Sequence, residues 1–316
     1  MPYFRRDGLK KHNKILFGPF VGELGWEIKR WAGFIRWFKS NNPSTIVNVC
    51  TREGRKELYS GYVDSIITFE IDGDYVDYRP NQYNLDWYPE DKYQSILALL
   101  KTTHKDFHIV ESPRRSGNKN YFDPTEMDFN FTPTEPNTTL IDSIMRKNMD
   151  KIPIAISPRH RIDMIDKNGV DTNARNWVES YWEDLYSLFE RHGHYYALIL
   201  GQGNTYKRPP ITNKACYCLE DYIDSSTGVN SMGLVLAAIQ KSKVVIGQQS
   251  ALPILANHMG IPTVMWGHEQ HRHQVIENPL GTKCVFFPEK STDYITNPSI
   301  IYESIGKLLK DIKHDN

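Results

Sequence analysis

The sequence predicts an α/β protein with two Rossmann-like parallel-sheet domains and an interdomain cleft. Three observations lead to the two domains, and the cleft is what the family resemblance described below implies. Short apolar runs alternate with amphipathic segments of helix length along most of the chain, which is typical of parallel sheets covered by helices. The pattern starts near Lys14 and starts again near Ile152. A chain of 316 residues also suits two domains better than one core.

The first half opens with a strand over 14–17, followed by the glycine-punctuated loop GPFVGELG. A helix should come next, because apolar residues recur at steps of four and three until Asn41-Asn42-Pro43. This stripe consists of Leu24, Ile28, Trp31, Ile35 and Phe38. Further strands are expected over 45–49, 65–69 and 107–110, with helices over 93–102 and 139–148. We expect a loose basic arm over 1–13. Irregular structure is expected over 70–95 and 112–138, because these segments are rich in Asp, Asn, Tyr and Pro.

The second half repeats the α/β order. Strands are expected over 152–157, 195–200, 215–219 and 283–287, and helices over 177–192, 232–241 and 298–312. Gly193 is placed to stop the first of these helices. The domains therefore divide as 1–150 and 151–297. Residues 298–316 form a closing helix, for which packing back on the N-terminal domain is one option.

The stretch KVVIGQQSALPILANHMGIPTVMWG, residues 243–267, reads as a strand, a polar turn, a helix and a second strand. Ser250 is a plausible N-cap for a helix over 251–259. In a parallel sheet this turn places backbone N–H groups and a positive helix end at the carboxyl edge, where phosphate groups bind. The alternative is a crossover that binds no ligand, as most do.

The composition argues against a required polyanionic partner, a disulfide framework and a membrane span. Acidic and basic residues balance at 38 each, so nothing demands a polyanionic partner. Four cysteines in so long a chain do not form a disulfide framework, and we expect buried thiols. The sequence has no apolar run long enough for a membrane span and no signal peptide before the first strand, so a cytoplasmic location is expected.

Three stretches together resemble GT-B glycosyltransferases, most closely the heptosyltransferase-like family. They are GPFVGELGWEI (18–28), ISPRHR followed by ARNW and an amphipathic helix (156–189), and the strand-turn-helix-strand stretch at 243–267. The resemblance implies a nucleoside-diphosphate sugar donor bound mainly by the second domain, a glycan or other hydroxyl acceptor, inversion at the sugar and no metal. The chain departs from the family where Gln249, Ser250, Ala251 and Ile254 replace its Asp, Thr, Gly and His, which leaves the donor open.

The resemblance also implies roles for individual residues. Glu23 would be the general base that takes the acceptor proton, with Glu27 as the fallback; the alternative is that Glu23 only favours the first turn of a helix. Gly22, Gly25 and Trp26 join Glu27 on the acceptor side. Arginine forks suit a diphosphate, and polar side chains at the strand ends would complete the donor site. The donor-binding set is Arg159, Arg161, Arg175, Gln202, Gln249, Ser250, Ala251, His268 and Glu269.

Other functions stay open on the sequence alone. The segment HEQHRH, 268–273, could bind zinc, but no second ligand cluster accompanies it, so no metal site is expected. A modified base in DNA is an alternative acceptor, which the basic residues Arg5, Arg6, Lys10, Lys11, Arg114 and Arg115 would serve if they cluster. A sugar epimerase on the same fold would need no acceptor. The changed positions 249 and 254 also allow a non-catalytic module that binds a glycan or a protein partner.

Overall fold

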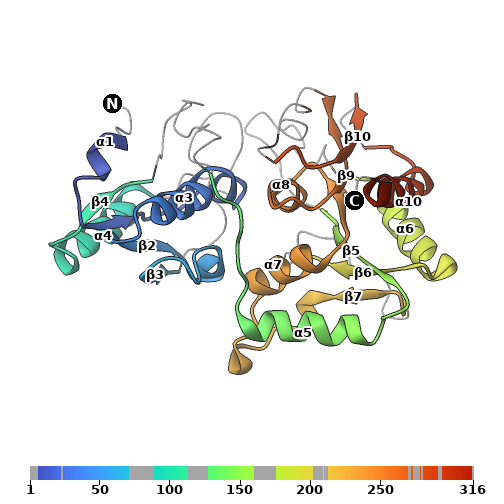
Figure 1. Cartoon of the computed structure of the whole chain (residues 1–316), viewed down its shortest axis with the longest axis horizontal. Helices are drawn as coiled ribbons and strands as arrows, with labels where there is room; N and C mark the ends of the chain where they lie inside the picture. Colours follow the sequence, from blue (N-terminus) through green and yellow to red (C-terminus); the bar gives the residue numbers. More distant parts are fainter. Residues whose placement is uncertain are drawn as a thin grey trace. The chain divides into compact units, whose positions relative to one another are not determined.

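A computed structural model of the chain describes residues 6–22, 24–70, 89–112, 127–159, 176–201, 209, 213–269, 272, 278, 280–290 and 294–314. Two compact units make up the chain. Unit 1 holds the described residues up to Thr132, and unit 2 holds those from Pro133 onward. Figure 1 labels most of the helices and strands of both units. No helix among the described residues is both long enough and apolar enough to cross a membrane.

Unit 1 is a four-stranded parallel sheet in the order β3-β2-β1-β4. Ile15 of β1 lies opposite Val47 of β2 and His108 of β4. The predicted strands are confirmed within a few residues. The elements are α1 (Arg6–Leu9), β1 (Lys14–Phe17), α2 (Leu24–Trp26), η1 (Glu27–Ala32), α3 (Gly33–Asn41), β2 (Ile46–Arg52), η2 (Glu53–Leu58), β3 (Ser65–Phe69), α4 (Glu90–Thr103) and β4 (His108–Val110).

The helix after β1 differs from the prediction in its middle. The apolar stripe is confirmed, since Ile28, Trp31, Ile35 and Phe38 are buried. However, the six residues of η1 form a π-helix between α2 and α3. Glu27, the first residue of η1, is fully buried with the stripe. The short helix α1 also lies within the segment expected to be a loose arm.

Unit 2 is a six-stranded parallel sheet in the order β10-β9-β8-β5-β6-β7. Numbered within the unit, this is the 3-2-1-4-5-6 order of a Rossmann fold. The elements are α5 (Glu135–Arg146), β5 (Ile152–Ser157), α6 (Glu179–His192), β6 (Tyr195–Ile199), β7 (Cys216–Cys218), η4 (Leu219–Tyr222), η5 (Ser225–Thr227), α7 (Ser231–Lys241), β8 (Val244–Gln248), α8 (Ala251–His258), β9 (Thr263–His268), β10 (Cys284–Glu289) and α10 (Pro298–His314). The prediction of two Rossmann-like α/β domains is thus confirmed.

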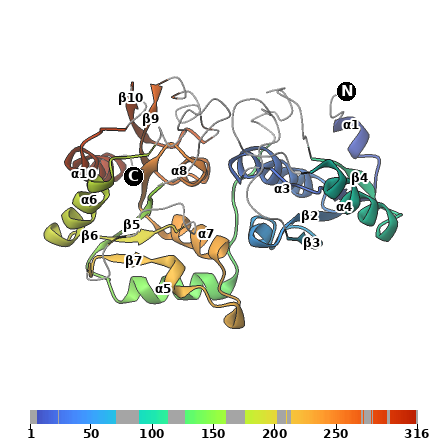
Figure 2. The same ribbon diagram turned by 180° about the vertical axis from the view of Figure 1, so that it is seen from behind.

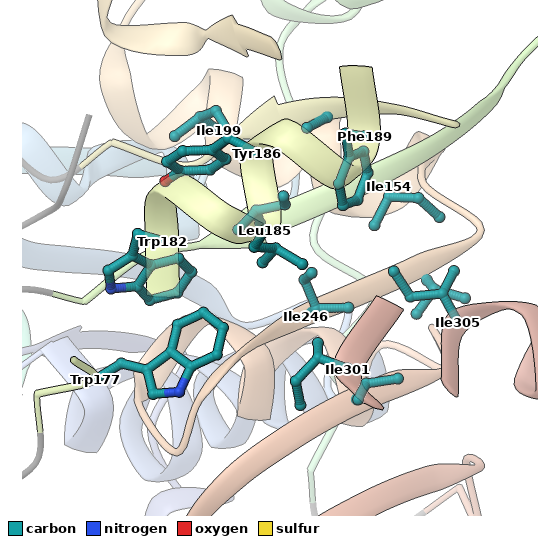
Figure 3. Close-up of a cluster of buried hydrophobic side chains, with 14 of the residues drawn as sticks. Ile154, Trp177, Trp182, Leu185, Tyr186, Phe189, Ile199, Ile246, Ile301 and Ile305 are labelled. Carbon is teal, nitrogen blue, oxygen red and sulfur yellow. The ribbon is translucent and has the colours of Figure 1, made fainter. Parts of the chain in front are cut away.

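Helices cover both faces of the unit 2 sheet. On one face, alternate residues of β5 and β8 such as Ile154 and Ile246 pack under α6 and α10 (Figure 3). Trp182 of α6 and Ile301 of α10 belong to the same buried cluster. On the other face, Ile254 of α8 packs on Met265 of β9. Successive side chains of a strand point to opposite faces of the sheet. Because helices cover both faces, neither β5 nor β8 has a side that faces solvent, which explains why both strands are apolar throughout.

Two further segments belong to unit 2. The apolar stripe of α10 (Ile301, Ile305 and Leu308) is buried in the core of this unit. The α5 segment, placed in the first domain by the sequence, packs beside α7 (Figure 2). The Asn230 N–H donates to Asn137 Oδ1 of α5 over 3.1 Å, which fixes this contact.

The four cysteines are free thiols, in agreement with the sequence. Burial raises the pKa of Cys50 to about 12 and that of Cys284 to about 11. Thiols with such pKa values stay protonated near neutral pH and are poor nucleophiles. These cysteines therefore act as small apolar side chains.

Candidate functional site

The carboxyl edge of the unit 2 sheet has a topological switch point between β5 and β8. The two strands are neighbours, and Ser157 lies opposite Gly247 at the end of their pairing. The chain leaves β5 toward α6 on one face, whereas it leaves β8 into α8 on the other face. Loops that part in this way open a crevice beside the strand ends, and ligands of open α/β sheets bind there.

A hydrogen bond joins the two loops at this point. The backbone N–H of Arg159, two residues past β5, donates to Oε1 of Gln248 over 3.0 Å. Gln248 is the last residue of β8, and its side chain has no exposed surface. Arg159 is itself buried, with 9% of its surface exposed. The sequence singled out Arg159 but not Gln248, because the role of Gln248 depends on a neighbour that is 89 residues away.

Close packing places the residues that begin α8. Gln249 N–H donates to the Trp266 carbonyl over 2.8 Å, which ties the turn after β8 to β9. A Cβ at Gly267 would lie 2.6 Å from Cβ of Gln249, so the Gln249 side chain occupies space that only glycine leaves open. Gln249 is buried as a result, with 7% of its surface exposed.

The start of α8 has features that favour a bound anion. Ser250 is the N-cap by its extended backbone, as predicted, but its side chain makes no capping hydrogen bond. Ser250 and Ala251 are partly exposed. The first turn of α8 contains no acidic residue. The first N–H groups of a helix lack partners within the helix and carry partial positive charge, so they favour a bound anion.

Two other residues that the sequence predicted to bind the donor, His268 and Glu269, lie at the end of β9 and directly after it. His268 ends β9, and its ring meets the ring of Tyr294 edge-on at 5.5 Å between centroids. Glu269 is exposed and pairs with Arg272 over 3.3 Å. Arg161, Arg175 and Gln202 lie outside the described residues.

The segment after β10 is fixed to the residues that precede α6. Glu289 is buried and accepts hydrogen bonds from the backbone N–H groups of Ile295 and Thr296, at 3.0 and 2.7 Å. The Thr296 carbonyl in turn accepts the indole N–H of Trp177 over 2.8 Å. Trp177, part of the ARNW motif, is therefore a core residue that anchors the approach to α6.

The carboxyl edge of the unit 1 sheet carries the glycine-rich loop. Gly18 N–H donates to the Val110 carbonyl over 2.8 Å, and Ser112 Oγ donates to the Pro19 carbonyl over 2.7 Å, so the segment after β4 holds the start of the loop. Glu23 and the side chain of Trp26 lie outside the described part of the chain. Gly25 lies within α2.

Glu27 is the centre of a buried polar cluster that the sequence did not predict. Its Oε1 accepts from Thr51 Oγ1 over 2.6 Å and from Tyr59 OH over 2.7 Å. Its Oε2 accepts from Arg55 Nη1 over 2.7 Å. Thr51 is the residue before the last one of β2, and Arg55 lies in η2. Both belong to the polar stretch TREGRKELY, residues 51–59. A stretch of this composition reads as a solvated loop, so the sequence gives no local signal that Arg55 is buried.

A zinc site at 268–273 is not described by the structure, because three of these six residues lie outside the described part. Among the residues that the structure does describe, no group of three or more His, Cys, Asp or Glu side chains could hold a metal ion. The basic residues considered for DNA are also partly outside this range: Arg5, Arg114 and Arg115 are not described, while Lys10 and Lys11 are exposed.

Comparison with known proteins relates this geometry to solved structures. Over 94% of its length, the chain superposes on a glycosyl transferase family 9 protein from Veillonella parvula DSM 2008 with a TM-score of 0.53 and 11% identity, covering 89% of that chain. It superposes on the ADP-heptose LPS heptosyltransferase II of E. coli with a TM-score of 0.57 and 13% identity, over 94% of this chain and 99% of the other. No protein-family model and no curated protein sequence matches.

The chain shares the fold of these glycosyltransferases. The resemblance to GT-B enzymes that three sequence stretches indicated is therefore confirmed for the fold. One departure from the family pattern also has a structural explanation. Ile254, which replaces a histidine, is 4% exposed and packs on Met265 between α8 and the sheet.

Proposed function

We propose that the chain is a glycosyltransferase that moves a sugar from a nucleoside-diphosphate sugar to a hydroxyl group of an acceptor. The observation that carries the proposal is the switch point of unit 2, where the Arg159 backbone bonds Gln248 beside the start of α8. A diphosphate suits this position, because a helix N-terminus and guanidinium groups both favour anions. The names of the two similar structures agree with the reaction, one being a glycosyl transferase and the other acting with ADP-heptose.

In this proposal the donor diphosphate binds at the first turn of α8. Ser250 and Ala251 supply backbone N–H groups, and Gln249 fixes the turn that presents them. Arg159 contributes positive charge, joined by Arg161 and Arg175. Gln202, His268 and Glu269 would contact the ribose, base or sugar from the ends of neighbouring strands.

The reaction we propose is a direct displacement with inversion. The acceptor oxygen forms a bond to the anomeric carbon while the bond from that carbon to the diphosphate oxygen breaks. Glu23 takes the proton of the acceptor hydroxyl, and the leaving diphosphate keeps the bonding electron pair. The arginines and the positive end of α8 stabilise the charge that develops on the leaving group, so this scheme uses no metal.

Two assays on the full chain test the proposal. A thermal-shift screen with ADP-, GDP-, UDP-, CMP- and dTDP-sugars should show a selective rise of the melting temperature, because a ligand of the native state stabilises it. The selected donor should then release its nucleotide, a nucleoside diphosphate under this proposal, when mixed with hydroxyl acceptors, and Glu23→Gln should abolish this release. A folded protein that binds no donor would contradict the proposal. Binding without turnover by the wild type would instead favour a non-catalytic module.

A further inference from the structure

The buried cluster around Glu27 reaches the residue that precedes the proposed base. Arg55 Nη1 donates to the Gly22 carbonyl over 2.6 Å, in addition to its bond with Glu27. Gly22 is followed directly by Glu23. One guanidinium nitrogen therefore joins a buried carboxylate to the backbone of the glycine-rich loop.

The cluster is closed to solvent and well satisfied. Glu27, Thr51 and Tyr59 have no exposed surface, and Arg55 is 6% exposed. Both oxygens of Glu27 accept hydrogen bonds, two at Oε1 and one at Oε2. Removal of Arg55 would leave the buried Glu27 carboxylate without this positive partner, which is costly.

Stability alone does not explain an ion pair in this place. Burying both charges costs desolvation energy that the attraction between them roughly repays, and apolar residues of similar volume often stabilise a protein as much or more. The feature that apolar residues could not supply is a directed hydrogen bond to the Gly22 carbonyl. The bond pattern thus indicates that the pair fixes the loop.

The local backbone also indicates that the cluster has a functional role at the glycine-rich loop. Glu27 begins the π-helix η1, and π-helical turns occur frequently at functional sites. Thr51 lies near the end of β2, the neighbour of β1, and Arg55 and Tyr59 follow that strand, so the cluster joins the chain segments at the ends of two adjacent strands. Those segments lie at the carboxyl edge of the sheet, where parallel α/β sheets place their reactive groups.

We propose that Arg55 and Glu27 are positioning residues for the general base of the transferase. Glu27 orients the Arg55 guanidinium, and Arg55 holds the Gly22 carbonyl, which belongs to the residue directly before Glu23. Tyr59 and Thr51 keep the Glu27 carboxylate in place. The inference rests on the proposed function, because it assigns the cluster to the orientation of Glu23, and it gives neither Glu27 nor Arg55 a contact with substrate.

Arg55→Lys tests this role in the full chain. Lysine keeps the positive charge but lacks the fork geometry with which arginine reaches both Gly22 and Glu27. Lys56→Ala is the matched control, since Lys56 is the next residue on η2 and its side chain pairs with Glu53 at the surface. Tyr59→Phe is a milder second variant, which removes a single donor to Glu27 and keeps the aromatic ring.

Two readouts separate positioning from simple loss of fold. Hydrogen exchange of the peptide covering 18–26 should be faster in Arg55→Lys and Tyr59→Phe than in wild type, while peptides of unit 2 are unchanged. The kcat should fall by at least about tenfold with the donor KM within about twofold, since a small misplacement of a reacting group is costly and donor binding lies in unit 2. Lys56→Ala should match wild type in both readouts.

The outcomes distinguish this inference from the proposed function. Unchanged exchange over 18–26 in both variants would overturn the positioning role, whether or not the enzyme is active. Faster exchange with an unchanged kcat would overturn the catalytic consequence. An inactive wild type that binds no donor would overturn the proposed function, and the exchange data would still decide whether Arg55 holds the loop.

Discussion

At the scale of single residues, a few buried polar groups hold the loops at the carboxyl edge of each sheet. Gln248 accepts the Arg159 N–H in unit 2, and Glu27 collects three donors in unit 1. A buried polar group that lost its partner would cost about 1–3 kcal/mol. These residues therefore restrict the conformations of the loops that we assign to donor and base.

Tyr59 gives the cluster a measurable pH dependence. Burial, and then the nearby Glu27 carboxylate, raise the pKa of Tyr59 well above 10.0. The phenol ionises near pH 10 in the unfolded chain but stays protonated in the folded one. Its contribution to stability is therefore full below pH 10 and declines as pH rises above it, by up to about 1.4 kcal/mol per pH unit.

The Tyr59→Phe variant should lose less stability than wild type between pH 10 and 11, because it lacks this phenol. Urea midpoints followed by tryptophan fluorescence would measure the difference, and the same comparison at pH 8 gives the fixed cost of the lost hydrogen bond. Parallel stability curves above pH 10 would show that Tyr59 does not titrate as its burial requires.

At the scale of elements, helix and strand positions were largely predictable and the side-chain clusters were not. The alternating apolar pattern identified β5 over its exact residues, and Gly193 stops α6 with a φ of 65°. Periodicity carries no information on which distant residues meet. The Arg55–Gly22 and Gln248–Arg159 contacts join residues 33 and 89 positions apart, so sequence patterns could not reveal them.

The turn between β8 and α8 depends on a glycine of the next strand. Gly267→Ala should lower the free energy of unfolding by roughly 1–3 kcal/mol, because the new Cβ would lie 2.6 Å from Cβ of Gln249. Donor affinity should fall as well, since Gln249 must move. Gly54→Ala is the control, with no atom within 4 Å of the added Cβ. Equal melting temperatures for the two variants would contradict the packing described for this turn.

At the scale of the whole molecule, we propose different tasks for the two units. We assign the donor to unit 2, whose strands follow the Rossmann order, and the general base to the glycine-rich loop of unit 1. The repeated α/β pattern predicted two α/β domains, and the fold shared with two glycosyltransferases agrees with them. The division between the units was less predictable, because the contacts that join α5 to α7 depend on residues such as Asn137 and Asn230 that look like ordinary helix-end residues.

Calorimetric titration of ADP, GDP, UDP and dTDP into the full chain tests the central claim most directly, when wild type is compared with Ser250→Asp. Aspartate is as good an N-cap as serine, so α8 should stay folded, but its charge would occupy the anion position. Ser231→Asp places the same charge in the first turn of α7 as a control. We expect one nucleotide to bind wild type and Ser231→Asp with equal affinity. The same nucleotide should bind Ser250→Asp at least about tenfold more weakly, which corresponds to about 1.4 kcal/mol. Equal affinity for all three proteins would place the nucleotide elsewhere.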